Sequence, residues 1–288
     1  MMTIVSLIAA ALSMRFAGHL SNTPEMRRVT ASIDDIARMP RQQCVSLAQS
    51  PEVRTCDFGD PSAGTRIVLF GDSHAIQWFN PLMGMAESHG WKLTTFVKSG
   101  CPATDLREVN SPAFATACNT WRAEAIRRLV GIRPSAVFIG NATAYLRGEN
   151  NKPSISLQDW RDGTRRTLES LSNAGLRVAV MRDNPHFAFD VPTCWARSLR
   201  HSWYPGGSCE TSQSAALDPA IFAAEKAAAQ GLSNVHFIDM TDQLCREDTC
   251  WTLQKGEVMY RDDNHLTGSF ADRLMPVLES RFLPVLKF

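Results

Sequence analysis

The chain lacks an excess of charge of either sign. Its 288 residues carry 30 Lys and Arg against 29 Asp and Glu, a formal net charge of +1. A domain that binds nucleic acid usually shows a basic stripe or patch in its charge balance. The balance therefore argues against nucleic acid as a partner, and it does not favour a polyanionic substrate.

The chain also lacks internal repeats, low-complexity tracts and a long apolar run. The apolar N-terminal stretch, residues 3–14 (TIVSLIAAALSM), is shorter than the roughly 20 residues that a transmembrane helix needs. It is similar to the hydrophobic region of a signal peptide, although no Lys or Arg precedes it. We predict that residues 1–40 form a signal-like or membrane-proximal segment: a cleaved signal, a short anchor or the remnant of a membrane span. Residues 41–64 are predicted to be a linker or extension, and residues 65–288 the main domain.

No Cys-x-x-Cys pair occurs, and the cysteine spacings do not match common zinc sites, so no metal or other cofactor is predicted. The eight cysteines instead fall into neighbouring pairs, although eight cysteines allow about 105 pairings and buried free thiols are the alternative. Disulfides would indicate an exported protein in the periplasm or another extracytoplasmic space, with attachment to the membrane through its N-terminal segment as one option. The neighbours are Cys44 with Cys56, Cys101 with Cys118, Cys194 with Cys209, and Cys245 with Cys250.

From Arg66 onward, short apolar runs alternate with longer helical stretches. Near-continuous apolar strands of this kind are typical of a parallel sheet buried on both faces. The alternation predicts a doubly wound α/β domain. Residues 183–207, rich in proline and aromatic residues, interrupt it and are predicted to form an ordered insertion near the site or a packed surface loop. The predicted strands are residues 66–70, 92–97, 136–139, 177–181 and 235–238, and the predicted helices are residues 75–88, 120–130, 157–173, 214–230 and 268–281.

A serine stands where the first of these strands gives way to a helix, in FGDSHAIQWF (residues 70–79). Ligands of open parallel sheets collect at the carboxyl ends of the strands, and the backbone N–H groups of a helix start favour negative charge. Ser73 is therefore a candidate acyl-transfer nucleophile. The alternative is that Asp72 or Ser73 simply caps the helix. Because neighbouring residues at a helix start point apart, His74 is predicted to serve in packing or polar support.

A candidate base follows the last strand, in YRDDNHLT (residues 260–267). Asp262 and His265 are three residues apart, so the carboxylate could support the imidazole while the other ring nitrogen faces Ser73. Two alternatives remain at this stage. Asp263 or Asn264 could cap a helix. An aspartate cluster could instead bind a metal, as in a phosphodiesterase using Asp72, Asp262 and Asp263.

Two further strand exits offer donors to an oxyanion. Gly100, in KSGCPA (residues 98–103), lets the backbone approach a ligand and present its N–H. Asn141, in FIGNAT (residues 138–143), can project a side-chain N–H group from the end of a strand. Each could instead be an ordinary turn residue.

Taken together, these blocks resemble the SGNH (GDSL-like) hydrolase superfamily. Its motifs match here in order over residues 65–288: Ser73 in Gly-Asp-Ser-His, Gly100, Asn141 after a glycine, and Asp262-x-x-His265. The resemblance implies a flavodoxin-like three-layer α/β/α sandwich with a mainly parallel five-stranded sheet. It also implies Ser73 as nucleophile, His265 as base and Asp262 as its support. The Ser73 and Gly100 N–H groups and the Asn141 side chain would form the oxyanion hole.

A narrower resemblance concerns the SGNH domain fused behind acyltransferase-3 membrane domains, whose proteins O-acetylate bacterial surface polysaccharides. It is carried by VLFGDSHAIQW, KSGCP, FDVPTCWAR and YRDDNHLT. It implies an enzyme, an SGNH-type O-acyltransferase or ester hydrolase, that acts on carbohydrate hydroxyls. The implied partners are a carbohydrate acceptor or acylated saccharide, with a membrane acyl-donor partner of the acyltransferase-3 type as one option.

Two alternatives stay open from the sequence: a stand-alone carbohydrate or acetyl esterase, and a non-catalytic carbohydrate-binding domain with the same fold. Transferase and esterase use the same residues, so the acceptor pocket decides between them. Four aromatic residues could stack on sugar rings or pack in the core. These are Trp78, Trp195, Trp203 and Tyr204.

Overall fold

The computed structural model describes residues 23–109, 111–147, 155–200 and 208–287, so the predictions for residues 1–22, Trp203 and Tyr204 lie outside it. Within these ranges the main sheet has six strands in the order β1-β3-β2-β4-β5-β7. All neighbours pair in parallel except β1 and β3, which pair antiparallel. The strands are β1 Thr55–Gly59, β2 Arg66–Gly71, β3 Lys92–Val97, β4 Ala136–Gly140, β5 Val178–Met181 and β7 Val235–Ile238.

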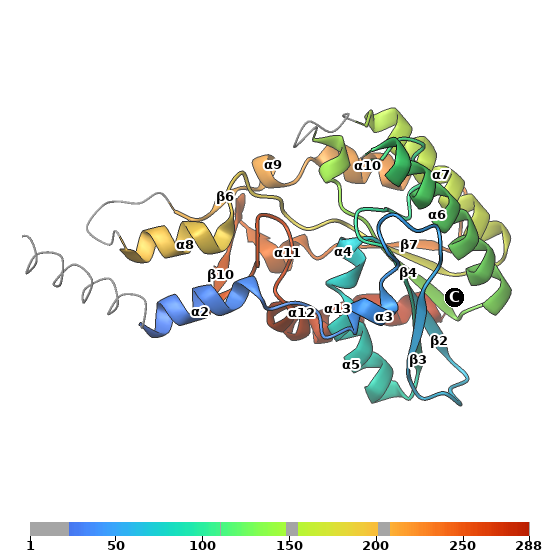
Figure 1. The fold of residues 1–288 in the computed structure, drawn as a ribbon, viewed down its shortest axis with the longest axis horizontal. Helices are drawn as coiled ribbons and strands as arrows, with labels where there is room; N and C mark the ends of the chain where they lie inside the picture. Colours follow the sequence, from blue (N-terminus) through green and yellow to red (C-terminus); the bar gives the residue numbers. More distant parts are fainter. Residues whose placement is uncertain (1–22, 110, 148–154, 201–207, 288) are drawn as a thin grey trace, which may run out of the picture.

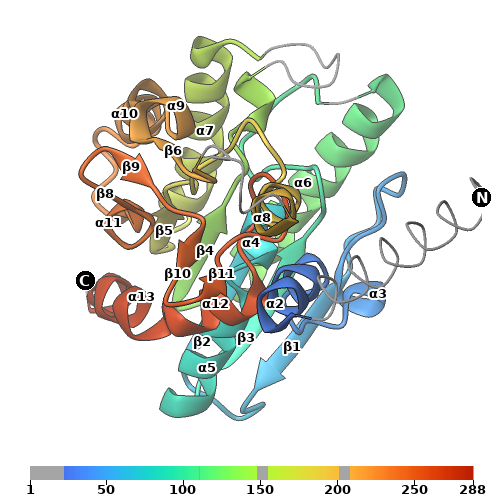
Figure 2. The ribbon, with the colours of Figure 1, turned by 90° about the vertical axis from the view of Figure 1, so that its left-hand side faces the viewer.

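Helices cover both faces of this sheet and make three layers (Figure 1, Figure 2). Along β2, Ile67 and Leu69 join one buried cluster, whereas Val68 and Phe70 join the other. Alternate residues of a strand point to opposite faces, so a continuous apolar run is what a sheet covered on both sides requires. The first face carries α5 Phe79–His89, α12 Gly268–Arg273 and α13 Met275–Phe282, and the second carries α6 Pro112–Ile132, α7 Leu157–Asn173 and α10 Pro219–Ala228.

The predicted α/β/α sandwich is thus confirmed, but the strand count was wrong. The sixth strand, β1, comes from the segment predicted to be a linker. As an edge strand it is nowhere fully buried, and it has no continuous apolar run that would reveal it. The disulfide Cys44–Cys56 ties β1 to α3 Arg41–Cys44. Residues 41–64 therefore contribute to the fold rather than only leading into it.

Proline accounts for several differences in helix boundaries. The last two predicted helices each divide in two, at Pro219 and near Pro276, where a missing N–H and a fixed φ favour a new helix start. The helix predicted over residues 120–130 begins earlier because Ser111 caps it and Pro112 fits its first turn. Residues 157–173 form a helix as predicted.

The predicted insertion at residues 183–207 contains a helix, α8 Val191–Arg200. The N-terminal helix α2 Pro24–Ile33 packs beside it, with Met26 and Val29 buried, so this part of the N-terminal segment also belongs to the folded unit (Figure 1). Among the described residues no helix has both the length and the apolar character of a membrane span. The remaining elements are α4 Ser73–Ile76, η1 Ala144–Leu146, β6 Thr211–Ser212, α9 Gln213–Ala216, α11 Thr241–Leu244, β8 Cys245–Arg246, β9 Thr249–Cys250, β10 Leu253–Gln254, β11 Glu257–Val258 and η3 Leu283–Leu286.

All eight cysteines are paired, and each is bonded to its predicted neighbour. The bonds close short loops, with sequence separations between 5 and 17 residues. The four disulfides are Cys44–Cys56, Cys101–Cys118, Cys194–Cys209 and Cys245–Cys250.

Candidate active site

Three strands end level with one another at the site. In the sheet register, Gly71 at the end of β2 pairs with Val97 on β3 and with Gly140 on β4. Ser73, the segment that starts at Lys98, and Asn141 therefore all leave the sheet at one edge. The close approach requires glycine at two positions. A Cβ on Gly71 (φ +141°) would lie 2.0 Å from the Gly140 carbonyl oxygen, and one on Gly140 would lie 2.7 Å from Ala75 Cα.

Asp72, and not Ser73, caps helix α4. The Asp72 carboxylate accepts a hydrogen bond from the His74 N–H at 2.8 Å. It also accepts bonds from the Ala142 N–H at 2.9 Å and from the Tyr145 hydroxyl at 3.0 Å, which tie α4 to the segment after β4. The cap thus frees the Ser73 hydroxyl for another partner.

That partner is His265. Its Nε2 lies 2.9 Å from Ser73 Oγ, and its Nδ1 lies 2.8 Å from Asp262 Oδ2. The structure therefore brings the three residues together in the order hydroxyl, imidazole and carboxylate that serine nucleophiles require. Ser73 and His265 are both partly exposed, so a ligand can reach the hydroxyl.

The three-residue spacing of Asp262 and His265 has a local cause. Asp262 Oδ1 accepts hydrogen bonds from the backbone N–H groups of Asn264 and His265, at 3.0 and 2.6 Å. This turn leaves the second carboxylate oxygen facing the imidazole. The helix-cap alternative for Asp263 and Asn264 was wrong, because Thr267 caps α12.

Hydrogen bonds join the loop that carries His265 to the helix that carries Ser73. Gln77, directly after α4, accepts a hydrogen bond from the Leu266 N–H at 2.9 Å and donates to Asn184 Oδ1 at 2.5 Å. Asn184 in turn donates to the Asn264 carbonyl. The hydrogen-bonded series Gln77–Asn184–Asn264 thus fixes the distance between Ser73 and His265.

Electrostatics favour a neutral base beside an ionised carboxylate. Burial lowers the pKa of His265 to about 4, and the neighbouring His74 contributes to the decrease. Burial alone would raise the pKa of Asp262, but hydrogen bonds from His265 and from backbone N–H groups hold it well below its usual value. At neutral pH, His265 is thus able to accept the proton of Ser73, and Asp262 is able to stabilise the imidazolium that results.

The oxyanion candidates occupy ordered positions. Gly100 adopts a left-handed φ of +73° in a turn that the Cys101 N–H closes on the Lys98 carbonyl at 3.0 Å. Asn141 Oδ1 accepts the Ala103 N–H at 2.7 Å, and its Nδ2 donates to Thr104 Oγ1 at 3.3 Å. The side-chain amide is thereby oriented, and one of its two N–H bonds is engaged within the described part of the chain. The oxyanion role of both residues stays a prediction.

The family model for the SGNH domain (fused to AT3 domains) matches residues 43–280. The chain belongs to this family. Among solved structures, the periplasmic domain of a lipopolysaccharide acetyltransferase of Salmonella ser. Paratyphi A is 16% identical, with a TM-score of 0.60 over 77% of this chain and 84% of that one. A GDSL-like lipase of Bacteroides thetaiotaomicron is 12% identical, with a TM-score of 0.46 over 92% of this chain and 98% of that one. No curated protein matches the chain.

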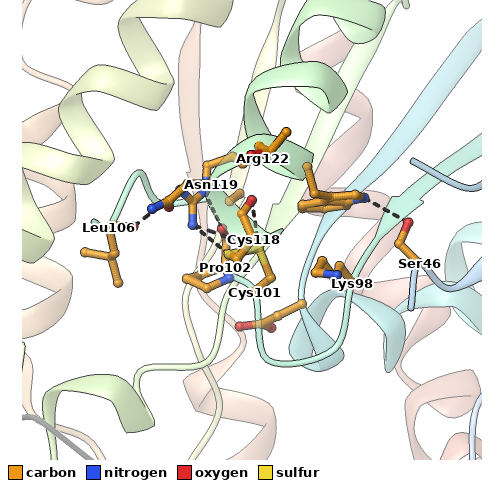
Figure 3. The surroundings of a disulfide bond; sticks show 12 residues. Ser46, Lys98, Cys101, Pro102, Leu106, Cys118, Asn119 and Arg122 are labelled. Atoms are coloured by element: carbon orange, nitrogen blue, oxygen red, sulfur yellow. Dashed lines mark hydrogen bonds between the residues drawn. A yellow bond between two sulfur atoms is a disulfide. The ribbon is translucent and has the colours of Figure 1, made fainter. Parts of the chain in front are cut away.

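The SGNH domain holds its Gly100 segment with a buried arginine beside a disulfide (Figure 3). Arg122 on α6 is 2% exposed and donates from Nε to the Pro102 carbonyl at 2.9 Å, while its Nη2 lies 3.0 Å from Cys118 Sγ. Burial lowers the pKa of Arg122 to about 10. The side chain is therefore charged at neutral pH, and its bonds clamp the segment that carries Gly100 and Ala103.

We expect Arg122→Met to reduce the free energy of unfolding by about 3 kcal/mol, because the substitution leaves buried carbonyl groups without their donor. Urea unfolding followed by tryptophan fluorescence measures the change. Arg127→Met is the control, since Arg127 lies on the same helix, exposed and paired with Glu124. Equal unfolding midpoints for the two variants would contradict the clamp.

His74 is buried and hydrogen-bonded, as its predicted role in packing or polar support requires, but the buried polar cluster to which it belongs was not predicted. His74, Asp183 and His186 are the group of metal-type ligands that lies close together among the described residues. His74 Nδ1 and His186 Nε2 are 2.6 and 2.7 Å from the Asp183 carboxylate oxygens, which is the distance of direct hydrogen bonds. Asp72 and Asp262, two of the three aspartates proposed as ligands of a phosphodiesterase, bond to different partners. The available signal for the cluster was the position of Asp183, just past the end of β5.

The aromatic residues proposed for sugar stacking separate into two groups. Trp78 is 1% exposed and belongs to the core, so that interpretation was wrong for it. Trp195 on α8 is partly exposed and donates to Thr252 Oγ1 at 2.9 Å. It stays a candidate for contact with a sugar.

Proposed function

We propose that this SGNH domain is a serine-dependent O-acyltransferase that moves an acyl group, most simply acetyl, to a carbohydrate hydroxyl of a bacterial surface polysaccharide. The observation that carries the proposal is the hydrogen-bonded series Ser73–His265–Asp262 at the carboxyl edge of the sheet. Family membership supports it, because these domains occur fused to AT3 domains. Four disulfides support an extracytoplasmic location.

The reaction has two halves. His265 Nε2 takes the Ser73 proton as Ser73 Oγ attacks the acyl carbonyl; the tetrahedral intermediate collapses, and the imidazolium returns the proton to the departing donor group. In the second half, His265 takes the proton of an acceptor hydroxyl as its oxygen attacks the acyl-serine. The imidazolium then returns this proton to Ser73 Oγ as the bond between Oγ and the acyl carbon breaks. The Ser73 N–H, the Gly100 N–H and the Asn141 amide are the proposed donors to the oxyanion, and one such donor is typically worth about 10²–10³ in turnover.

A stand-alone esterase is the second candidate, because Ser73 and His265 are partly exposed and water can reach an acyl-serine. The same residues serve both reactions, with water replacing the sugar hydroxyl in the second half. In the transferase, a membrane partner of the AT3 type would present the acyl group and a saccharide would accept it.

One experiment separates the candidates. The protein is incubated with p-nitrophenyl acetate and an oligosaccharide, and mass spectrometry follows the products. Acetylated oligosaccharide supports the transferase, whereas free acetate alone supports the esterase. A fluorophosphonate probe is applied in parallel, and peptide mapping locates the label. If Ser73 takes up no label and no ester is cleaved, the chain is a non-catalytic carbohydrate-binding domain.

A further inference from the structure

His74 lies directly behind the base. The side chain is 2% exposed, and its ring centroid is 4.6 Å from that of His265 and 5.4 Å from that of His186. One ring nitrogen, Nδ1, is 2.6 Å from Asp183 Oδ1, and the other, Nε2, is 3.3 Å from Asn264 Oδ1. Both nitrogens of His74 face oxygen acceptors, which is the environment of a doubly protonated ring.

The surroundings of Asp183 keep its carboxylate ionised. Its two carboxylate oxygens accept from both imidazoles, and in addition from the Thr143 N–H at 2.7 Å, the Thr143 hydroxyl at 2.8 Å and the Asn184 N–H at 2.9 Å. A carboxylate with this many donors keeps its charge even when buried. A buried charge requires a counter-charge, and His74 supplies it.

We propose that His74 is a positioning residue, a standing imidazolium that keeps the adjacent His265 neutral and holds its loop in place through Asn264. The inference about charge rests on the geometry, and its catalytic consequence rests on the proposed function. A like charge at this distance makes a second protonation costly. His265 thus stays neutral instead of taking a proton from solvent, and it can accept the proton of Ser73.

The charged and titratable groups around both rings agree with this assignment. His74 faces Asp72 from its own turn, Asp183 and His186 from the segment after β5, and His265 from the loop before α12. His265 faces Asp262, Arg261 and His74. Burial lowers the pKa of His74, but Asp183 outweighs this and the net effect raises it to about 9.

The sign of the pH effect follows from these values. His265 is a competent base only above its own pKa, which lies at about 4 while His74 is charged. Without that charge the pKa of His265 moves up, toward the value of about 6.5 for an unperturbed histidine. When the medium is acidified, a variant that lacks the charge therefore loses its activity at a higher pH than the wild type does.

The first test needs no variant. The protein is labelled with ¹⁵N in its histidine rings, and the ring signals are followed by NMR from about pH 3 to about pH 8. We expect the His74 signals to stay those of an imidazolium across the neutral range while His265 titrates near pH 4. A neutral His74 ring at pH 7 would overturn the proposal.

The second test removes the charge pair together, in His74→Gln with Asp183→Asn, so that no unpaired charge is left buried. We expect the NMR midpoint of His265 to rise by about one to two pH units, the usual effect of a charge within about 4–6 Å. The pH at which kcat/KM for p-nitrophenyl acetate falls to half on the acid side should rise with it. His89→Gln is the control, because His89 lies at the end of α5 in an ion pair with Glu279.

An unchanged His265 midpoint in the double variant refutes the inference. Failure of the proposed function looks different, since the wild type would then leave the ester and the fluorophosphonate unreacted whatever the midpoints are. The NMR midpoints do not depend on turnover, so they decide the role of His74 in either case.

Discussion

Replacing Ser73 with alanine is expected to reduce kcat for ester cleavage and acyl transfer by about 10⁵–10⁶, because the substitution removes the hydroxyl that would form the acyl intermediate. Ser73 Oγ is the atom that receives the His265 hydrogen bond at 2.9 Å. The loss should appear in kcat with little change in KM, since the hydroxyl acts in the chemical step. The measurement is initial rates with p-nitrophenyl acetate, corrected for the uncatalysed reaction.

The fold should tolerate this change, because Asp72 and not Ser73 caps α4. Circular dichroism and thermal unfolding of Ser73→Ala should match the wild type. Ser88→Ala is the matched control: Ser88 also lies on a helix after the same strand, but its hydroxyl bonds only to the Met85 carbonyl in its own turn. Retention of more than about a tenth of the wild-type kcat by Ser73→Ala would be inconsistent with a serine nucleophile.

Asp262→Asn is expected to lower kcat by about 10⁴, the loss typical when the carboxylate of a serine triad becomes an amide. The amide oxygen can still accept the Asn264 and His265 N–H groups, so the turn should survive. Its NH₂ group would then face His265 Nδ1 where Asp262 Oδ2 now lies at 2.8 Å. An amide donor there favours the tautomer with the proton on Nε2, which cannot accept the proton of Ser73.

The alanine variant separates the two roles of Asp262. Asp262→Ala removes the turn as well as the charge, so it should lose the same activity and also stability, visible as a lower unfolding midpoint. If Asp262→Asn were as active as the wild type, the carboxylate would serve only the turn.

Local patterns made most of the site predictable. The Gly-Asp-Ser-His block stands at a strand exit, and Asp262 with His265 lies within one turn, so short stretches of sequence carry both signals. The level register of β2, β3 and β4 places Ser73, Lys98 and Asn141 at one edge, which the α/β alternation indicates. The His265 loop is joined to that edge by the bonds of Gln77 and Asn184, which no local pattern indicates.

The parts that were missed depend on distant contacts. His74 and Asp183 are 109 residues apart, and neither the strand-exit position of Asp183 nor the predicted polar role of His74 reveals that they pair. Strand β1 was missed because an edge strand needs no apolar run. The two interpretations of Trp78 stayed open because an aromatic residue after a site serine can equally well belong to the core. Tertiary packing decides such cases, and a single sequence does not display it.

Ser73 and His265 are separated by 192 positions along the polypeptide. During synthesis, Ser73 therefore emerges well before the imidazole that contacts its hydroxyl. In the proposed mechanism, acyl transfer starts only once the segment that carries His265 has emerged and docked. A copy in which this segment is missing or unfolded would consequently leave esters intact.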